Sequence, residues 1–313
     1  MPMRISDSNL FDASVRSIQQ NHVRLAELQT QVATGKRINS LADDPASATQ
    51  VFDLRRGLAR IDMFGRSIDA ARSQLDQSEA ALSQLGGVLT RLRELAVSAD
   101  VETGEFDQIQ SEVEQLFGEV VAIANTRSGS QYLFAGFRSD AAPFSVAGSF
   151  VPGGASPTVS YNGDSGAVLA QIGESSTIQV NEPGSALFQG DSNGDGTFPD
   201  APRVNIFQVI TDFRDRLQAR DSAGMLTTIG ELDGAIDQVL VTRGAIGARS
   251  NRIDIAERQL SSIKVALKVE RANLEEVDVI EAATALRSQE AVFQSALAVT
   301  ARVLQPTLLD FLH

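Results

Sequence analysis

Two long proline-free stretches with a seven-residue hydrophobic repeat dominate this sequence. The chain has nine prolines, yet none lies between Pro45 and Pro143 or between Pro202 and Pro306. One series in the first stretch is Leu54, Ile61, Ile68, Leu75, Leu82, Leu89 and Ala96, and one in the second is Leu232, Val239, Ile246, Ile253, Leu260, Leu267 and Leu274. Proline disrupts helix interiors, and a sustained seven-residue repeat favours left-handed supercoiling against a partner. The pattern therefore predicts two long, paired helices.

Both ends of the chain continue this pattern. The N-terminal series is Phe11, Ile18, Leu25 and Val32. Gly35 is expected to end that helix, and Asp44-Pro45 to start the next, with Asp44 as the cap. The C-terminal stripe is Phe293, Leu297, Thr300, Leu304, Leu308 and Phe311. Pro306 interrupts it, which predicts a kink or a helix end there. Shorter helices are predicted at about 106–125 and 203–219.

The middle of the chain, residues 139–200, has a different composition. It contains no Lys or Arg, seven acidic residues and ten glycines. Its short β-branched or alternating runs are separated by turn sequences, and they are 144–151, 158–161, 167–172 and 177–180. We therefore predict a mainly α fold. Both chain ends form a long antiparallel coiled-coil helical rod, and a small antiparallel β domain is inserted between the two arms.

The composition leaves little chemistry for an enzyme. Cysteine is absent, which excludes disulfides and thiol nucleophiles, and the only histidines are His22 and His313. The formal charge of −13 argues against non-specific binding to nucleic acid or to an anionic membrane. No apolar run is long enough to span a bilayer, and no cleavable secretory signal is evident at the start. We expect no catalytic residue, no cofactor and no metal.

Two local patterns have a functional and a structural interpretation. Residues 191–196 resemble the first half of a calcium loop, but its twelfth position is Pro202 instead of Glu. An acidic, glycine-rich turn is the better interpretation, and binding of a cation by Asp191 and Asp195 stays open. Gly86-Gly87 and Gly244-x-x-Gly247 follow no strand, so a phosphate-binding loop is not expected. Close helix packing or a local hinge explains them better.

The sequence of the two arms resembles the bacterial flagellin family. Residues 28–50, LQTQVATGKRINSLADDPASATQ, resemble its N-terminal signature, and residues 91–98, RLRELAVS, resemble the family's Arg-Glu-Leu-Ala-x-x step. In the second arm, GAIGARSNRI at 244–253 and the segment 296–312 resemble its C-terminal region. Within the family, two segments resemble the members at the hook–filament junction more than they resemble flagellins. They are residues 43–45 (Asp-Asp-Pro) and residues 132–136. A short flagellin that forms the filament is the alternative.

The resemblance implies an architecture and a set of partners. In the assembled flagellum, the innermost coiled-coil layer, which lines the central channel, would consist of residues 1–40 and 275–313. The helical rod outside it would consist of residues 41–138 and 203–274. The outermost part, a β domain, would consist of residues 139–202. The implied partners are further copies in a ring, the first hook-associated protein, flagellin, and a cytoplasmic export chaperone at the C-terminal helix. Export would be unfolded, through the flagellar type III apparatus, to the extracellular flagellum. The implied assembly interface consists of Phe11, Ile18, Leu25, Val32, Arg37, Asn39, Asp43, Asp44, Phe293, Leu297, Leu304, Leu308 and Phe311.

Two other classes of protein share some of these features. A free-standing helical adhesin or fibre protein would use the same paired helices, but the resemblance at both termini argues against it. An enzyme domain at 139–200 is weaker still, because that segment has no His, Cys, Lys or Arg.

Overall fold

The computed structural model describes residues 3–99, 106–151, 154–191, 193 and 196–309. The chain divides into two compact units. One comprises Met1–Ile61 with Ser262–His313, and the other comprises Asp62–Ser261. The long helices α2 (Pro45–Ser98) and α5 (Ser222–Glu275) contribute to both units. The predicted mainly helical fold is confirmed, whereas its division into three domains stays a prediction.

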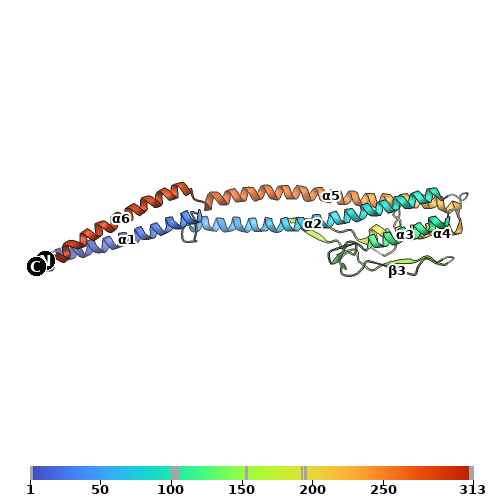
Figure 1. Ribbon diagram of the computed structural model, residues 1–313, viewed down its shortest axis with the longest axis horizontal. Helices are drawn as coiled ribbons and strands as arrows, with labels where there is room; N and C mark the ends of the chain where they lie inside the picture. The colour runs from blue at the N-terminus through green and yellow to red at the C-terminus, as the bar shows by residue number, and fades with distance from the viewer. Residues whose placement is uncertain (1–2, 100–105, 152–153, 192, 194–195, 310–313) are drawn as a thin grey trace. The chain divides into compact units, whose positions relative to one another are not determined.

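In the first unit the two ends of the chain pack together. Helix α1 (Met3–Thr34) lies beside α6 (Val279–Leu309), as Figure 1 shows, so the predicted antiparallel pairing of the arms is confirmed. Gly35 has a φ of 67° and ends α1 as expected. Helix α2 begins at Pro45, and the Asp44 carboxylate accepts from the backbone N–H of Ser47 at 3.1 Å. The predicted cap is therefore present.

Helix α6 differs from the prediction at Pro306. We expected a kink or a helix end there, but the helix runs through Pro306 to Leu309. The predicted helix end is therefore wrong. Proline removes one backbone hydrogen bond, and this loss costs little so close to the end of a helix, where few bonds remain to be broken.

In the second unit α2 and α5 run antiparallel, held by pairs such as Arg72–Asp254 at 2.8 Å and Arg243–Glu79 at 2.7 Å. Helices α3 (Phe106–Ala124) and α4 (Ile206–Ala219) pack against each other and share the core with the long helices. The buried seam positions confirm the predicted repeat and include Ile68, Leu75, Leu82, Leu89, Leu232, Val239, Ile246 and Ile253. Farther along α5, Leu260, Leu267 and Leu274 are only half-buried.

The predicted strands of the middle segment pair as hairpins. Strand β3 (Phe144–Ala147) pairs with β4 (Thr158–Tyr161), and β5 (Leu169–Gly173) pairs with β6 (Ser176–Gln179), each antiparallel. A further hairpin, β1 (Arg127–Ser128) with β2 (Gln131–Tyr132), precedes them. These described strands form separate two-stranded sheets, so a single β sheet is not present.

The hairpins rely on the helices for their core. Phe144 of β3 packs against Phe188 and against Phe207 of α4, with ring centroids 5.2 Å apart in each pair. Phe188 lies in a short π-helix, Ser185–Gln189, which the sequence pattern did not predict. A two-stranded hairpin is marginal by itself in water, so this shared aromatic cluster explains how the middle segment is held.

Candidate functional site

The paired terminal helices and the loop after α1 carry most of the residues predicted for an assembly interface. Ile18, Leu25 and Val32 of α1 and Phe293 of α6 are half-buried. The two helices are joined by the side-chain amide of Gln289, which donates to the side-chain oxygen of Asn21 at 3.0 Å. The predicted seam therefore contributes to the pairing of α1 with α6 inside one chain.

Other members of the predicted set lie elsewhere. Leu297 of α6 is 45% exposed and does not belong to the buried part of the pair. The side chains of Phe11, Leu304 and Leu308 lie outside the described part of the structure, as does Phe311 altogether. Their proposed contacts therefore remain predictions.

The helix pair leaves several apolar side chains uncovered. Among the exposed ones are Val23 of α1 and Ile280, Val292 and Val299 of α6. Of the α1 residues whose side chains are described, Leu28 alone is buried. The pair therefore encloses little core of its own and presents apolar surface that a further helix would cover.

The loop after α1 is folded around the carboxylate of Asp43. Its oxygens accept from the backbone N–H groups of Asn39 and Ser40, both at 2.8 Å, and from the Ser40 hydroxyl at 2.9 Å. These backbone bonds hold the pKa of Asp43 below its ordinary value. Hydrogen bonds from Ser47 do the same for the pKa of Asp44. Both acidic residues are thus charged and serve to shape the loop and to start α2.

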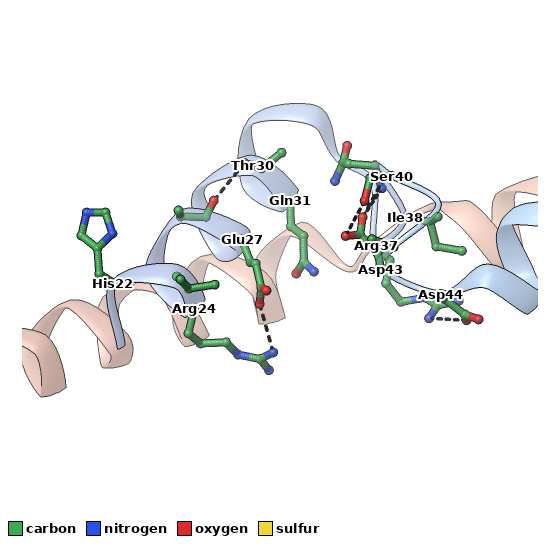
Figure 2. A pocket seen from close by; sticks show the side chains of 14 residues that line it. His22, Arg24, Glu27, Thr30, Gln31, Arg37, Ile38, Ser40, Asp43 and Asp44 are labelled. Carbon is green, nitrogen blue, oxygen red and sulfur yellow. Dashed lines mark hydrogen bonds and ion pairs between the residues drawn. The ribbon is translucent and has the colours of Figure 1, made fainter. Parts of the chain in front are cut away.

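A groove lies between this loop and the second half of α1, and Figure 2 shows the side chains that line it. Its volume is about 790 Å³, and its walls come from residues 22–31 and 37–44. Arg24 pairs with Glu27 on one wall, and Arg37 lies 3.5 Å from Asp44 on the other. The predicted residues Arg37, Asn39, Asp43 and Asp44 are therefore gathered at one place. Their role in assembly stays a prediction.

Glu275, the last residue of α5, is a member of the site that sequence reasoning missed. Its side chain is 4% exposed and accepts from Lys36 and from Arg55, each at 2.6 Å. Burial opposes its charge, but the bonds from Lys36 and Arg55 outweigh that cost and hold the pKa of Glu275 below its ordinary value. The partners lie more than two hundred residues away along the chain, so no local pattern could have shown the contact.

No arrangement suited to catalysis was found in the described residues. His22 is exposed, and its ring centroid lies 6.0 Å from that of Phe293. No group of three or more potential metal ligands occurs within those residues. In the calcium-like turn, Asp191 accepts from the backbone N–H of Gly196 at 3.2 Å, while Asp195 lies outside the described part. Over the same residues, no helix is long and apolar enough to cross a membrane.

The glycines at 86–87 and at 244 and 247, singled out in the sequence, have open space where a side chain would begin. A Cβ atom added at Gly86, Gly87, Gly244 or Gly247 would meet no atom within 4 Å. Close packing of helices inside this chain therefore does not require these glycines, and a local hinge stays a prediction.

Comparison with known proteins gives a consistent result at both ends of the chain. Residues 5–139 match the bacterial flagellin N-terminal helical region, and residues 229–312 match the bacterial flagellin C-terminal helical region. Flagellar hook-associated protein 3 of Salmonella typhimurium is 23% identical over 309 residues, which are 94% of this chain and 94% of that protein. Flagellin of Bacillus subtilis is 24% identical over 314 residues, which are 97% of each chain.

A solved structure agrees in fold. The flagellar junction protein FlgL from Legionella pneumophila is 19% identical and superposes with a TM-score of 0.57, covering 72% of this chain and 100% of that one. The two family regions together cover more than half of the sequence, and they coincide with the paired helices described above. This chain therefore belongs to the bacterial flagellin family and is a structural protein of the flagellum, not an enzyme.

Proposed function

We propose that this chain is a junction protein that connects the flagellar hook to the flagellin filament. The supporting observations are the similarity to a hook-associated protein and the similarity to a solved junction protein, because the length of the match alone is shared with a flagellin. Hook-associated protein 3 of Salmonella typhimurium is matched over 94% of both chains, so the middle segment is included along with the ends. The Legionella junction protein is covered along 100% of its solved chain. The Asp43-Asp44-Pro45 sequence and residues 132–136 support the same member of the family.

The proposed partners follow from that position. Copies of this chain would form a ring that contacts the first hook-associated protein on one side and flagellin on the other. A cytoplasmic chaperone would bind the C-terminal helix before export. The chain would then pass unfolded through the flagellar type III apparatus to the extracellular flagellum. The formal charge of −13 argues against nucleic acid or a membrane as a further partner.

The uncovered faces of α1 and α6 support self-association. Val23, Val292 and Val299 are apolar and about half exposed, so covering the exposed part of each would stabilise an assembly by on the order of 1 kcal/mol. The loop that carries Arg37, Asn39, Asp43 and Asp44 adds charged and polar groups beside this surface. We propose that these two features, with the predicted terminal residues, form the contacts between neighbouring copies.

Deletion of the gene, followed by electron microscopy and analysis of the medium, tests this function. The expected result is an intact hook, no filament, and flagellin released into the medium as monomer. Expression of the wild-type chain in the same strain is the control and restores filaments. Filaments in the deletion strain would contradict the junction function.

A filament-forming flagellin is the second candidate, because the flagellin of Bacillus subtilis matches 97% of both chains at 24% identity. The two functions differ in what the purified protein does alone. A junction protein stops at short rings or remains monomeric, whereas a flagellin grows into long filaments from added seeds. Long filaments of the purified chain would establish the second function in place of the first.

A further inference from the structure

The backbones of the two linkers between helices are tied to each other. One linker follows α1 and comprises residues 35–44, and the other joins α5 to α6 and comprises residues 276–278. The N–H of Arg37 donates to the carbonyl of Glu275 at 2.7 Å, and the N–H of Val277 donates to the carbonyl of Gly35 at 3.1 Å. Residues 36 and 276 form an antiparallel bridge. The linker between α1 and α2 and the linker between α5 and α6 therefore lie side by side and form one short antiparallel backbone pairing.

Side chains reinforce this pairing around a single buried carboxylate. Lys36 of the first linker and Arg55 of α2 each lie 2.6 Å from one oxygen of Glu275. Arg271, one turn back on α5, lies 3.6 Å from the other oxygen. The guanidinium of Arg37 also donates to the carbonyl of Leu274 at 3.0 Å. Cations from three separate elements thus converge on the end of α5.

Helix stability alone does not explain a glutamate at this place. The C-terminal end of a helix carries a partial negative charge, so a carboxylate there is unfavourable. Burial adds a further cost, since a buried charge must be paired. The shortest ion pairs that offset these costs come from Lys36 and Arg55, both outside α5, while Arg271 of α5 lies farther away at 3.6 Å. Glu275 is therefore suited to holding other elements against the end of its helix.

We propose that Glu275 is a positioning residue, a buried charge lock that fastens the two linkers together and sets where α1 and α6 begin and end relative to α2 and α5 within this unit. While Glu275 is charged and bound to Lys36 and Arg55, the backbone pairing holds the two linkers together. With Glu275 neutral, Lys36 and Arg55 face each other without a counter-ion, and the backbone pairing opens more often. This inference goes beyond the proposed function and rests only on contacts inside the first unit.

Hydrogen exchange of the purified full-length chain tests the lock. The test variant is Glu275→Gln, which keeps the size of the side chain and removes its charge. The matched control is Glu276→Gln, because Glu276 is adjacent, exposed and identical in charge. We expect the amides of Arg37 and Val277 to exchange about tenfold faster or more in Glu275→Gln, since breaking a buried ion pair is strongly destabilising. In Glu276→Gln both amides should exchange as in the wild type.

A second measurement separates the lock from general unfolding. In Glu275→Gln the amides of α3 and α4 should keep their wild-type exchange, because they belong to the other compact unit. Lys36→Met should accelerate exchange at the amides of Arg37 and Val277 as well. In the double variant, Lys36→Met with Glu275→Gln, the acceleration should be smaller than the product of the two single-variant factors, because both residues act on one contact. Equal exchange in Glu275→Gln, Glu276→Gln and the wild type would overturn the proposal, as would acceleration that is uniform along the chain.

Discussion

The side-chain amide of Gln238 on α5 donates to the carbonyl of Leu187 at a nitrogen–oxygen distance of 2.6 Å. The side-chain oxygen of the same residue accepts from the N–H of Val204 at 3.1 Å. Gln238 is only 7% exposed, so water does not readily replace these bonds. One polar residue of a long helix therefore satisfies backbone groups on either side of the turn that returns the middle segment to α4.

Replacing Gln238 by Ala should destabilise the second unit by about 1–3 kcal/mol, because the carbonyl of Leu187 and the N–H of Val204 lose a buried partner. Unfolding in urea, followed by circular dichroism, measures the change. Gln208→Ala is the control, since Gln208 is exposed on α4 and its change should stay within about 0.5 kcal/mol. Equal effects of the two variants would show that the buried bonds are unimportant.

Gly136 is expected to tolerate no side chain. It has a φ of 70°, and an added Cβ would lie 2.2 Å from the backbone oxygen of Asp164. Gly136→Ala should therefore cost at least about 2 kcal/mol through strain and displacement of the loop. In contrast, Gly118→Ala on the exposed face of α3 meets no atom within 4 Å and should stabilise by about 0.5–1 kcal/mol. Thermal unfolding of both variants gives the comparison, and a stable Gly136→Ala protein would contradict this explanation.

The helical part of the fold could be predicted because its signals are local and repeated. The seven-residue series, the cap at Asp44 and the glycine at position 35 each act within one or two turns of the chain. Those signals, with the shorter apolar patterns, placed α2, α3 and α4 close to their observed bounds, and they located α1 and α5 without the start of either helix. The strands β3 to β6 were also located, whereas the β1–β2 hairpin was not. The packing of β3 depends on Phe188 and Phe207, which belong to other elements.

The candidate site was predicted less completely for the same physical reason. Arg37, Asn39, Asp43 and Asp44 were found because they lie in one short segment. Glu275 was not found, because its function depends on contacts with distant elements. The same reason applies, outside the site, to Arg214 of α4 in the second unit. Arg214 is fully buried, and its guanidinium reaches Glu114 of α3 at 3.0 Å and the carbonyl of Val151 at 3.1 Å. The sequence around a charged residue in a helix does not show which distant elements its side chain contacts in the folded chain.

The terminal helix pair should be the least stable part of the isolated chain. Leu28 is 8% exposed, whereas Val23 on the same helix is 56% exposed. Leu28→Ala removes buried apolar surface and should cost about 2 kcal/mol or more, which accelerates exchange along α1 and α6 in the monomer. Val23→Ala should leave the monomer within about 0.5 kcal/mol of the wild type and instead weaken incorporation into rings. Hydrogen exchange on the monomer and an assembly assay separate the two effects. Destabilisation of the monomer by Val23→Ala, with no effect of Leu28→Ala on it, would contradict this prediction.

Acid should open the linker pairing before it affects α3 and α4. The pKa of Glu275 is lowered in the folded chain, because the bonds from Lys36 and Arg55 outweigh the cost of burial. Its contribution to stability is therefore fully present above the unfolded-state pKa and is lost as the pH falls through the lower, folded-state value. Arg271 faces the same carboxylate, with its Nε 3.6 Å from the second oxygen of Glu275. Exchange at Arg37 and Val277 should thus accelerate, relative to the pH dependence of unstructured amides, as the pH falls below the ordinary glutamate value of 4.5.

Glu275→Gln should remove the part of this acid response that comes from Glu275, because the variant has no proton to take up at that position. Asp43 and Asp44 of the first linker also have lowered pKa values, so the loop that they shape should still loosen in acid. The amides of Arg37 and Val277 in this variant should exchange fast at neutral pH and change less in acid than those of the wild type. Glu182 of the second unit provides an internal contrast, since burial raises its pKa although Arg249 opposes the shift. A raised folded-state pKa means that protonation of Glu182 in acid favours the folded state, so loosening near Glu182 is not expected from this group. If the linkers of Glu275→Gln still opened in acid as those of the wild type do, another carboxylate would have to control the pairing.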